Sequence, residues 1–131
     1  AYPVGILREP ITLDIRDGRI EEFSGGAQAK EFESWFAGRN DSNIYRTCHY
    51  GFGINPAIRQ LSDLKFLNER MYGVFDIGFG TNDLPCFGGV IRANGHTDGL
   101  MTKATVKYDG TEVMRDGVFV HPALVKLFEK K

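Results

Sequence analysis

The sequence contains no apolar run close to the roughly 20 residues that a membrane-spanning helix needs. It also has no excess of one charge, because 16 lysines and arginines are balanced by 17 aspartates and glutamates and the formal net charge is -1. A pI near 6.3 gives no electrostatic reason to expect binding to nucleic acid or to an anionic membrane surface. We therefore expect a cytoplasmic protein with neither of these partners.

Cysteine is also scarce, since Cys48 and Cys86 are the only two in the chain. Two cysteines are too few for a disulfide framework, and we expect them to be reduced, partly buried thiols. Side chains alternate along a strand, so a strand around residue 48 would turn Cys48 away from His49 and into the packing.

The rest of the composition is that of a globular protein. The 131 residues are 42% hydrophobic and 25% charged, which predicts one domain over residues 1–131 with a core of its own. Glycine is the abundant residue, with 16 copies. In strands, such glycines indicate bulges or close approach of the backbone. Many lie near histidines and aspartates, at Gly51, Gly53, Gly73, Gly78, Gly80, Gly88, Gly89, Gly95 and Gly99.

Hydrophobic periodicity predicts a strand-rich chain with a few short helices. Strands are expected over residues 11–16, 19–23, 44–50, 71–80, 100–108, 111–114 and 118–120. The Asp-Gly pairs that begin at residues 17, 109 and 116 are typical of hairpin turns. Helical spacing is found over residues 27–37 and in the tail from Pro122, where Leu124, Leu127 and Phe128 are expected to face inward. The predicted class is α+β, with a strand-rich mixed sheet and β-hairpins.

One short motif carries the chemistry, His96-Thr97-Asp98 between two glycines. Side chains two positions apart lie on the same face of an extended chain, so His96 and Asp98 can converge on one cation. Gly95 and Gly99 allow the backbone to bend closely around such a cation. Short motifs of this kind are common in solvated loops, and an Asp that only caps its own turn is the alternative interpretation.

A second histidine completes a recognisable ligand set. His49, in a segment rich in glycine and aromatic residues, is the best candidate to join His96 and Asp98. Two imidazoles and one carboxylate with open positions suit mononuclear non-haem Fe(II) and its oxygen chemistry. The alternative is that both histidines are structural and hydrogen-bonded in tight turns.

Three more residues are candidates around this site. Asp76 is expected either to accept a hydrogen bond from a metal-bound imidazole or to be an ion-paired strand residue. Arg70 could bind an oxygen of a substrate, or could pair with Glu69 at the surface. Thr81 could donate a hydrogen bond to substrate, or could be a loop hydroxyl.

From Ile44 to Val120 the order of motifs resembles the C-terminal part of the aminopeptidase T-like metallopeptidases. That family has a Glu-Phe-Gly-Ile-Gly-Leu-Asn-Pro-like segment, a Gly-Thr-Val-His-Ile-Ala-Leu-Gly-like strand, then His-x-Asp-Gly and a final Asp-Gly hairpin. The corresponding segments here are residues 49–56, 73–80, 96–99, 107–110 and 116–117. The resemblance implies that residues 1–131 form the C-terminal, metal-binding domain of that fold.

Two departures from the peptidase pattern point to a different chemistry. Where the peptidases carry a metal-binding Glu before the Gly-rich turn, this sequence has His49, and where they carry a metal-binding His it has Asp76. A two-metal site needs bridging carboxylates, and the first replacement removes one. The set of His49, His96 and Asp98 instead resembles that of the iron-dependent 2,5-dihydroxypyridine 5,6-dioxygenases on the same fold.

This second resemblance implies an Fe(II)-dependent, extradiol-type dioxygenase that opens 2,5-dihydroxypyridine with O₂ to N-formylmaleamate, in nicotinate or nicotine degradation. Because such enzymes are longer, we expect a fragment whose catalytic acid and base groups lie in a missing N-terminal domain. We also expect a homo-oligomer, and no activity of the fragment alone. Two alternatives stay open: a two-metal aminopeptidase of the same fold, and a metal-free assembly module whose hairpins pair with another subunit.

Overall fold

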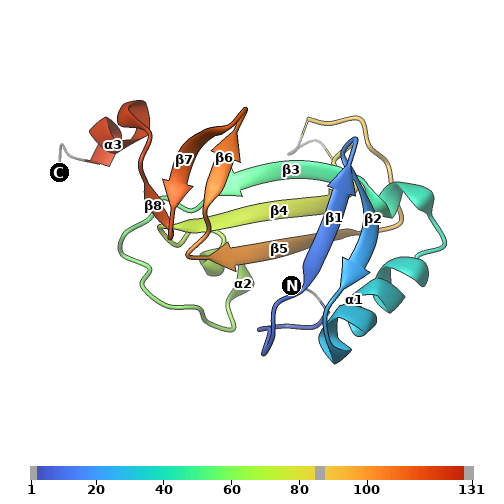
Figure 1. Cartoon of the computed structure of the whole chain (residues 1–131). Coiled ribbons are helices and arrows are strands. Elements are labelled where there is room, and N and C mark those ends of the chain that lie inside the picture. Colours follow the sequence, from blue (N-terminus) through green and yellow to red (C-terminus); the bar gives the residue numbers. More distant parts are fainter. Residues whose placement is uncertain (1–2, 85–87, 129–131) are drawn as a thin grey trace. The chain divides into compact units, whose positions relative to one another are not determined.

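The structure is a computed structural model that describes residues 3–84 and 88–128 (Figure 1). Its elements in chain order are β1 (Thr12–Arg16), β2 (Arg19–Ser24), α1 (Ala27–Ala37), the 3-10 helix η1 (Ser42–Tyr45), β3 (Thr47–Phe52), α2 (Lys65–Asn68), β4 (Val74–Gly80), β5 (His96–Thr102), β6 (Val106–Tyr108), β7 (Thr111–Arg115), β8 (Val118–Phe119) and α3 (Pro122–Phe128). The predicted strand-rich α+β class is confirmed. Among the described helices, none is long and apolar enough to cross a membrane.

The described strands form three small sheets, in the orders β1-β2, β3-β4-β5 and β6-β7-β8. The hairpin pairs β1-β2, β6-β7 and β7-β8 are antiparallel, and an isolated bridge between Asn55 and Met71 is parallel. Figure 1 shows that β4 runs in the opposite direction to β3 and β5.

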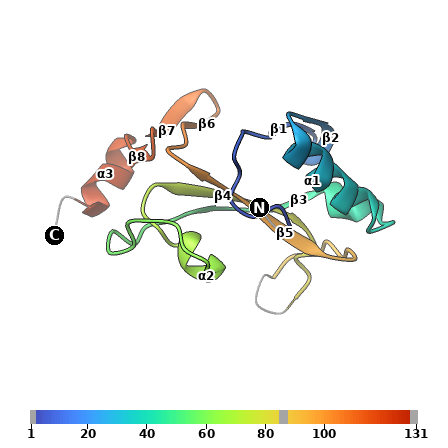
Figure 2. The ribbon, with the colours of Figure 1, turned by 90° about the horizontal axis from the view of Figure 1, so that it is seen from below.

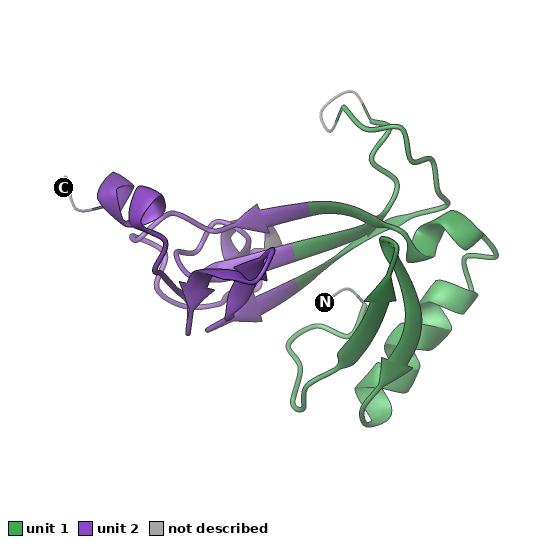
Figure 3. Ribbon diagram, turned by 45° about the horizontal axis from the view of Figure 1, so that its top comes forward, with its two compact units in different colours: residues 1–49, 77–99 green, residues 50–76, 100–131 purple. Residues whose placement is uncertain are grey.

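The chain divides into two compact units, coloured separately in Figure 3. The first unit comprises Ala1–His49 and Ile77–Gly99, and the second comprises Tyr50–Asp76 and Leu100–Lys131. The expectation that residues 1–131 behave as one domain stays a prediction.

In the first unit, α1 packs on the β1-β2 hairpin, as two views of the chain show (Figures 1 and 2). Asp17 and Gly18 have φ values of 49° and 70°, the left-handed pair that a type I′ hairpin turn requires. The helix buries Ala29, Phe32 and Phe36, as its spacing predicts. Removing a phenylalanine side chain of this kind from water stabilises the fold by about 1.5–3 kcal/mol.

The segment after α1 differs from the expectation. Residues 42–45 form η1, so the strand predicted over residues 44–50 begins only at Thr47. The side chain of Asp41 accepts the backbone N–H of Asn43 at 2.9 Å and stabilises this helical turn. Thr47 then donates its N–H to the carbonyl of Gly18 at 2.8 Å, which fixes the start of β3 beside the hairpin.

The strand β4 confirms the prediction of a strand buried on both faces, since all of Val74–Gly80 is buried. The next predicted strand, over residues 100–108, is wrong as a single element. It divides into β5, which starts at His96, and β6, because Lys103 between them has a φ of 54° and interrupts the extended backbone.

In the second unit, Asp109-Gly110 and Asp116-Gly117 form the predicted hairpin turns, each with two positive φ values. The core of this unit contains Met114 and Phe119, which are 0% and 5% exposed. The ring of Phe128 in α3 stacks on Phe119 with centroids 5.3 Å apart, so Phe128 faces inward as expected. Leu127 is 66% exposed, so its predicted inward position is wrong, and no residue of α3 is fully buried.

Candidate metal centre

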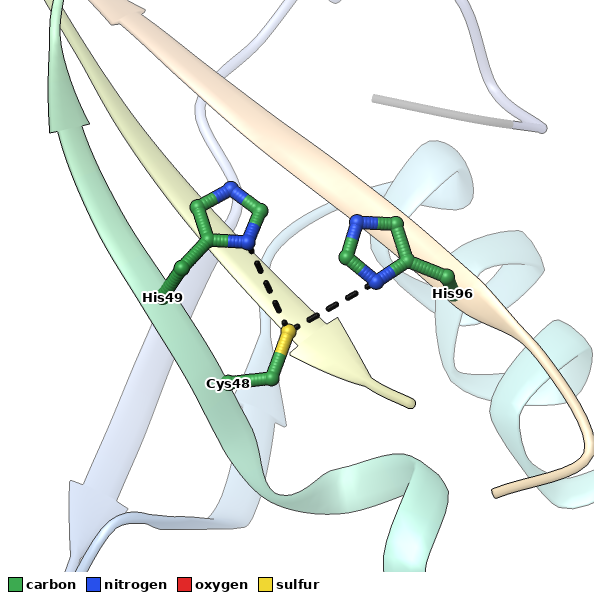
Figure 4. Close-up of side chains that lie close together, drawn as sticks. All are labelled: Cys48, His49 and His96. Atoms are coloured by element: carbon green, nitrogen blue, oxygen red, sulfur yellow. Dashed lines mark hydrogen bonds between the residues drawn. The ribbon is translucent and has the colours of Figure 1, made fainter. Parts of the chain in front are cut away.

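The strand order β3-β4-β5 brings the predicted metal ligands to the two strands that flank β4 in one sheet. His49 lies in β3, and His96 and Asp98 lie in β5. Figure 4 shows the two imidazole rings reaching toward each other across β4. Because His96 and Asp98 are two residues apart in an extended strand, they share one face as predicted.

Gly78 in β4 makes the space for one of these rings. A Cβ built on this glycine would lie 2.1 Å from Cε1 and 2.3 Å from Nδ1 of His49. No real side chain atom approaches another so closely, so only a glycine fits beneath the His49 ring. The abundance of glycine around the histidines indicated such close approaches from the sequence.

The Asp98 carboxylate lies between the two rings. Its Oδ1 is 3.0 Å from Nε2 of His96 and 3.3 Å from Nε2 of His49. The two rings are stacked, with centroids 5.3 Å apart and planes 20° apart. The side chains of His49, His96 and Asp98 are 30%, 22% and 29% exposed, so the three donors meet at a half-buried point that solutes can reach.

The other nitrogen of His96 has a partner that fixes its proton. Nδ1 of His96 lies 2.9 Å from the carbonyl oxygen of Thr81, and a carbonyl can only accept a hydrogen bond. Nδ1 therefore carries the hydrogen in this contact, which leaves Nε2 to face Asp98. Such a carbonyl contact is typical of a metal-binding histidine, because it sets the tautomer that supplies a lone pair on Nε2.

Without a cation, both nitrogens of His96 face acceptors. The hydrogen bond to Asp98 is the main reason that the pKa of His96 is raised to about 10 from its ordinary 6.5, and the contact with Cys48 adds to the rise. Burial acts in the opposite direction. A bound cation would replace the proton on Nε2.

The donor set fits a single divalent metal ion. Two neutral imidazole nitrogens and one carboxylate oxygen are the 2-His-1-carboxylate set of mononuclear iron sites. Adjacent ligand atoms of an octahedral ion, each about 2.1 Å from it, are about 3.0 Å apart. The 3.0 and 3.3 Å between Asp98 Oδ1 and the two Nε2 atoms agree with that spacing.

The position of the Cys48 side chain differs from the one predicted from the sequence. Its half-buried Sγ is 3.6 Å from Nδ1 of His49 and 3.6 Å from Nδ1 of His96 (Figure 4). The expectation that Cys48 faces away from His49 is therefore wrong, because its Sγ lies within contact distance of the His49 ring. The thiol Cys86 lies outside the described residues.

Thr81 and Asn82 hold the loop after β4 against this site. The Thr81 hydroxyl lies 2.7 Å from Oδ1 of Asp83 and 3.1 Å from the carbonyl of Ile91. Asn82 donates from its side-chain amide to the carbonyl of Cys48 at 2.9 Å. No local pattern pointed to Asn82, because its hydrogen-bond partner lies 34 residues away in the chain. The substrate-binding role expected of the Thr81 hydroxyl stays a prediction.

Arg70 and Asp76 belong to the second unit. Arg70 is exposed, and its guanidinium lies 3.6 Å from Oε2 of Glu69 and donates to the carbonyl of Phe66. These contacts agree with the alternative interpretation, in which Arg70 pairs with Glu69 at the surface. A role of Arg70 in binding substrate stays a prediction. Asp76 is buried in β4, two positions before Gly78, so both lie on the same face of that strand. Its expected hydrogen bond to a metal-bound imidazole stays a prediction as well.

The fold and the site together define a strand-rich α+β chain with a candidate 2-His-1-carboxylate metal centre. The profile of the 2,5-dihydroxypyridine 5,6-dioxygenase (NicX) family matches residues 4–121. The chain belongs to this family, and the resemblance inferred from the sequence is confirmed. No curated protein matches the chain.

A solved structure agrees with this assignment. The chain is similar to the 2,5-dihydroxypyridine dioxygenase from Pseudomonas putida KT2440, with 26% sequence identity and a TM-score of 0.72. The match covers 91% of this chain and 36% of that chain. The chain thus spans about a third of the length of the enzyme that it matches.

Proposed function

We propose that this chain is the metal-binding part of a ring-cleaving dioxygenase that opens 2,5-dihydroxypyridine with O₂. In this proposal His49, His96 and Asp98 hold one Fe(II) ion. The product would be N-formylmaleamate, as the resemblance to the family implies. The substrate class is therefore a small aromatic N-heterocycle with two hydroxyl groups.

One observation carries the proposal: in a chain of the dioxygenase family, the Oδ1 atom of Asp98 lies 3.0 Å from Nε2 of His96 and 3.3 Å from Nε2 of His49. Neutral imidazoles and a single carboxylate leave a divalent ion with a net positive charge. Three protein ligands also leave open positions for substrate and O₂. When bound, Fe(II) would supply a redox-active centre at which an electron-rich ring and O₂ are brought together.

The chain's own residues would position this centre. The Thr81 carbonyl accepts the Nδ1–H of His96 and so directs its Nε2 to the ion. Gly78 leaves the room that the His49 ring occupies. Asp98 supplies the negative charge, and its contacts with both Nε2 atoms keep the three donors together in the metal-free protein.

The proposal is tested by anaerobic titration of the chain with Fe(II), followed spectroscopically. Wild type should bind one equivalent, and His96→Ala and Asp98→Ala should each lose it. The matched control for the first variant is His121→Ala, because His121 lies in the second unit and contacts the N–H of Ala123 at the start of α3. It should bind Fe(II) like wild type.

Oxygen uptake with 2,5-dihydroxypyridine then tests the reaction, in the longest form of the enzyme that contains this chain. Uptake that depends on Fe(II) and is lost in Asp98→Ala is expected. If Fe(II) does not bind, or binds equally well to both site variants, the assignment of the three ligands is wrong.

Two alternative functions give different results. A two-metal aminopeptidase would bind two Zn²⁺ or Co²⁺ ions per chain and hydrolyse peptides. A metal-free assembly module would melt at the same temperature with and without Fe(II). By contrast, Fe(II) at 100 times its dissociation constant should stabilise the proposed site by about 2.7 kcal/mol.

The expected homo-oligomer and the cytoplasmic location form part of the proposal and rest on the sequence alone. Light scattering on the purified enzyme measures the first. Fractionation of the source cells measures the second.

A further inference from the structure

Each of the two imidazole rings directs its Nε2 atom to one partner and its Nδ1 atom to another, and the two rings share both partners. Both Nε2 atoms face Oδ1 of Asp98, at 3.3 Å for His49 and 3.0 Å for His96. Both Nδ1 atoms face Sγ of Cys48, each at 3.6 Å (Figure 4). The same pair of rings therefore has a carboxylate side and a thiol side.

The thiol side has the dimensions of a tetrahedral zinc site. Zinc binds thiolate sulfur at about 2.3 Å and imidazole nitrogen at about 2.0–2.1 Å, so the two atoms are about 3.5–3.6 Å apart at a tetrahedral angle. Both measured distances from Cys48 Sγ to the Nδ1 atoms are 3.6 Å. A donor atom of each of Cys48, His49 and His96 lies within 4.8 Å of the others.

We propose that Cys48, His49 and His96 form a second, alternative cation site, which takes a thiophilic divalent ion such as Zn²⁺ through Sγ and the two Nδ1 atoms. A water molecule would complete four-coordination. The incoming ion would displace two protons to solvent, the thiol proton of Cys48 and the Nδ1 proton of His96, because both groups must be deprotonated to bind a cation. Cys48 and both rings are half-buried, so the ion can reach them.

Asp98 would support this site without touching the ion. A ring that gives its Nδ1 lone pair to a cation carries its hydrogen on Nε2, and both Nε2 atoms already face the Asp98 carboxylate. A carboxylate that accepts the N–H of a zinc-bound histidine is the usual support of zinc ligands. The one contact given up is the hydrogen bond from Nδ1 of His96 to the Thr81 carbonyl.

The two sites exclude each other because each requires the opposite tautomer of the same two rings. When a cation is bound at the two Nδ1 atoms, both Nε2 atoms are protonated. Fe(II) on the carboxylate side requires the same Nε2 atoms to be unprotonated. Zn²⁺ would therefore compete with Fe(II) from a different position. This competition rests on the proposed Fe(II) function, whereas the thiol-side site itself does not.

The test uses the metal-free chain and Co²⁺, whose bond to a thiolate gives a charge-transfer band in the near ultraviolet. Wild type should show this band, and Cys48→Ser should lose it. Cys86→Ser is the matched control and should keep it. Asp98→Asn should also keep the band, because an amide oxygen can still accept the Nε2 hydrogens. Circular dichroism would establish that each variant is folded.

Calorimetry with Zn²⁺ gives the second measurement. Cys48→Ser should weaken Zn²⁺ binding by more than about 100-fold, whereas Asp98→Asn should weaken it by less than about 100-fold, the range for a group one step from the ion. No thiolate band in wild type, or Zn²⁺ affinity that Cys48→Ser leaves unchanged, would overturn the proposal. Fe(II) binding that survives Asp98→Asn would contradict the proposed function and leave the thiol-side site intact.

Discussion

The imidazole of His49 occupies the space that a side chain at residue 78 would need. A Cβ on Gly78 would lie 2.1 Å from Cε1 of that ring. In this position the Nε2 atom of His49 is 3.3 Å from Oδ1 of Asp98. The geometry of the site thus depends on the absence of a Cβ atom at Gly78 in β4.

Gly78→Ala is expected to weaken Fe(II) binding by about 10- to 100-fold, the range for groups that hold a metal ligand in place. The new methyl group must push the His49 ring away from Asp98, because the two cannot occupy the same space. Anaerobic Fe(II) titration of the variant measures the loss.

Gly51→Ala is the matched control for this substitution. Gly51 also lies in a strand, and a Cβ there would meet only Cβ of Asp76, at an ordinary contact distance of 3.7 Å. Fe(II) affinity should be close to that of wild type. Equal losses in both variants would show that any added methyl group disturbs the sheet, and would contradict the specific role of Gly78.

In the metal-free protein, His96 should keep both ring protons well above neutral pH. The hydrogen bond to Asp98 raises its pKa to about 10, and Asp98→Asn should bring this pKa back toward the ordinary 6.5. NMR titration of the imidazole resonances of the two proteins measures the difference. An unchanged pKa of His96 in Asp98→Asn would contradict the assigned cause.

The hydrogen bond between His96 and Asp98 also predicts that the stability of the metal-free protein depends on pH. Because the pKa of His96 is higher in the folded than in the unfolded chain, its stabilising contribution is fully present below about pH 6.5. It is lost as the pH rises from there through about 10. Urea unfolding should therefore show that the stability difference between wild type and Asp98→Asn shrinks over this range. A constant difference would argue against the His96–Asp98 pair as its source.

Thr81→Val should loosen the loop that carries the carbonyl partner of His96. The variant loses the hydroxyl contacts with Asp83 and Ile91, and the free energy of unfolding should fall by about 1 kcal/mol. Fe(II) affinity should fall by about tenfold, because the tautomer of His96 is less firmly set. Urea unfolding and Fe(II) titration measure these effects.

Thr111→Val serves as the control, since Thr111 is an exposed residue of β7 in the second unit. The stability and the Fe(II) affinity of the Thr111→Val variant should both remain near those of wild type. If Thr81→Val leaves Fe(II) affinity unchanged and raises the KM of the longer enzyme, the substrate-binding role predicted from the sequence is the better one.

Phe36→Ala should cost about 3–5 kcal/mol of unfolding free energy, because it leaves a cavity in the core of the first unit. Phe36 is 0% exposed, and its ring contacts those of Phe23, Tyr45 and Phe79. Phe66→Ala is the matched control, because Phe66 is 56% exposed and should lose no more than about 0.5 kcal/mol. Similar losses in the two variants would contradict the assigned core.

The sequence alone predicted the features that depend on neighbouring residues. The Asp-Gly pairs determined the hairpin turns, because few residues other than these adopt the positive φ values that such turns need. His96 and Asp98 share a face because alternation along a strand is a local property. Local signals failed at residues 44–46, where the Asp41 side chain stabilises a helical turn, and at Lys103, where a positive φ interrupts the strand.

Only the tertiary structure decided what surrounds those two residues. Cys48 and His96 are 48 positions apart, and their contact exists because β3 and β5 flank the same strand. The order of strands in a sheet and the close approach that Gly78 allows are set by packing across the whole chain. The spacing of residues in the sequence indicates neither the strand order nor this close approach. The sequence thus determined which groups could bind a metal, and the fold decided which of their atoms face one another.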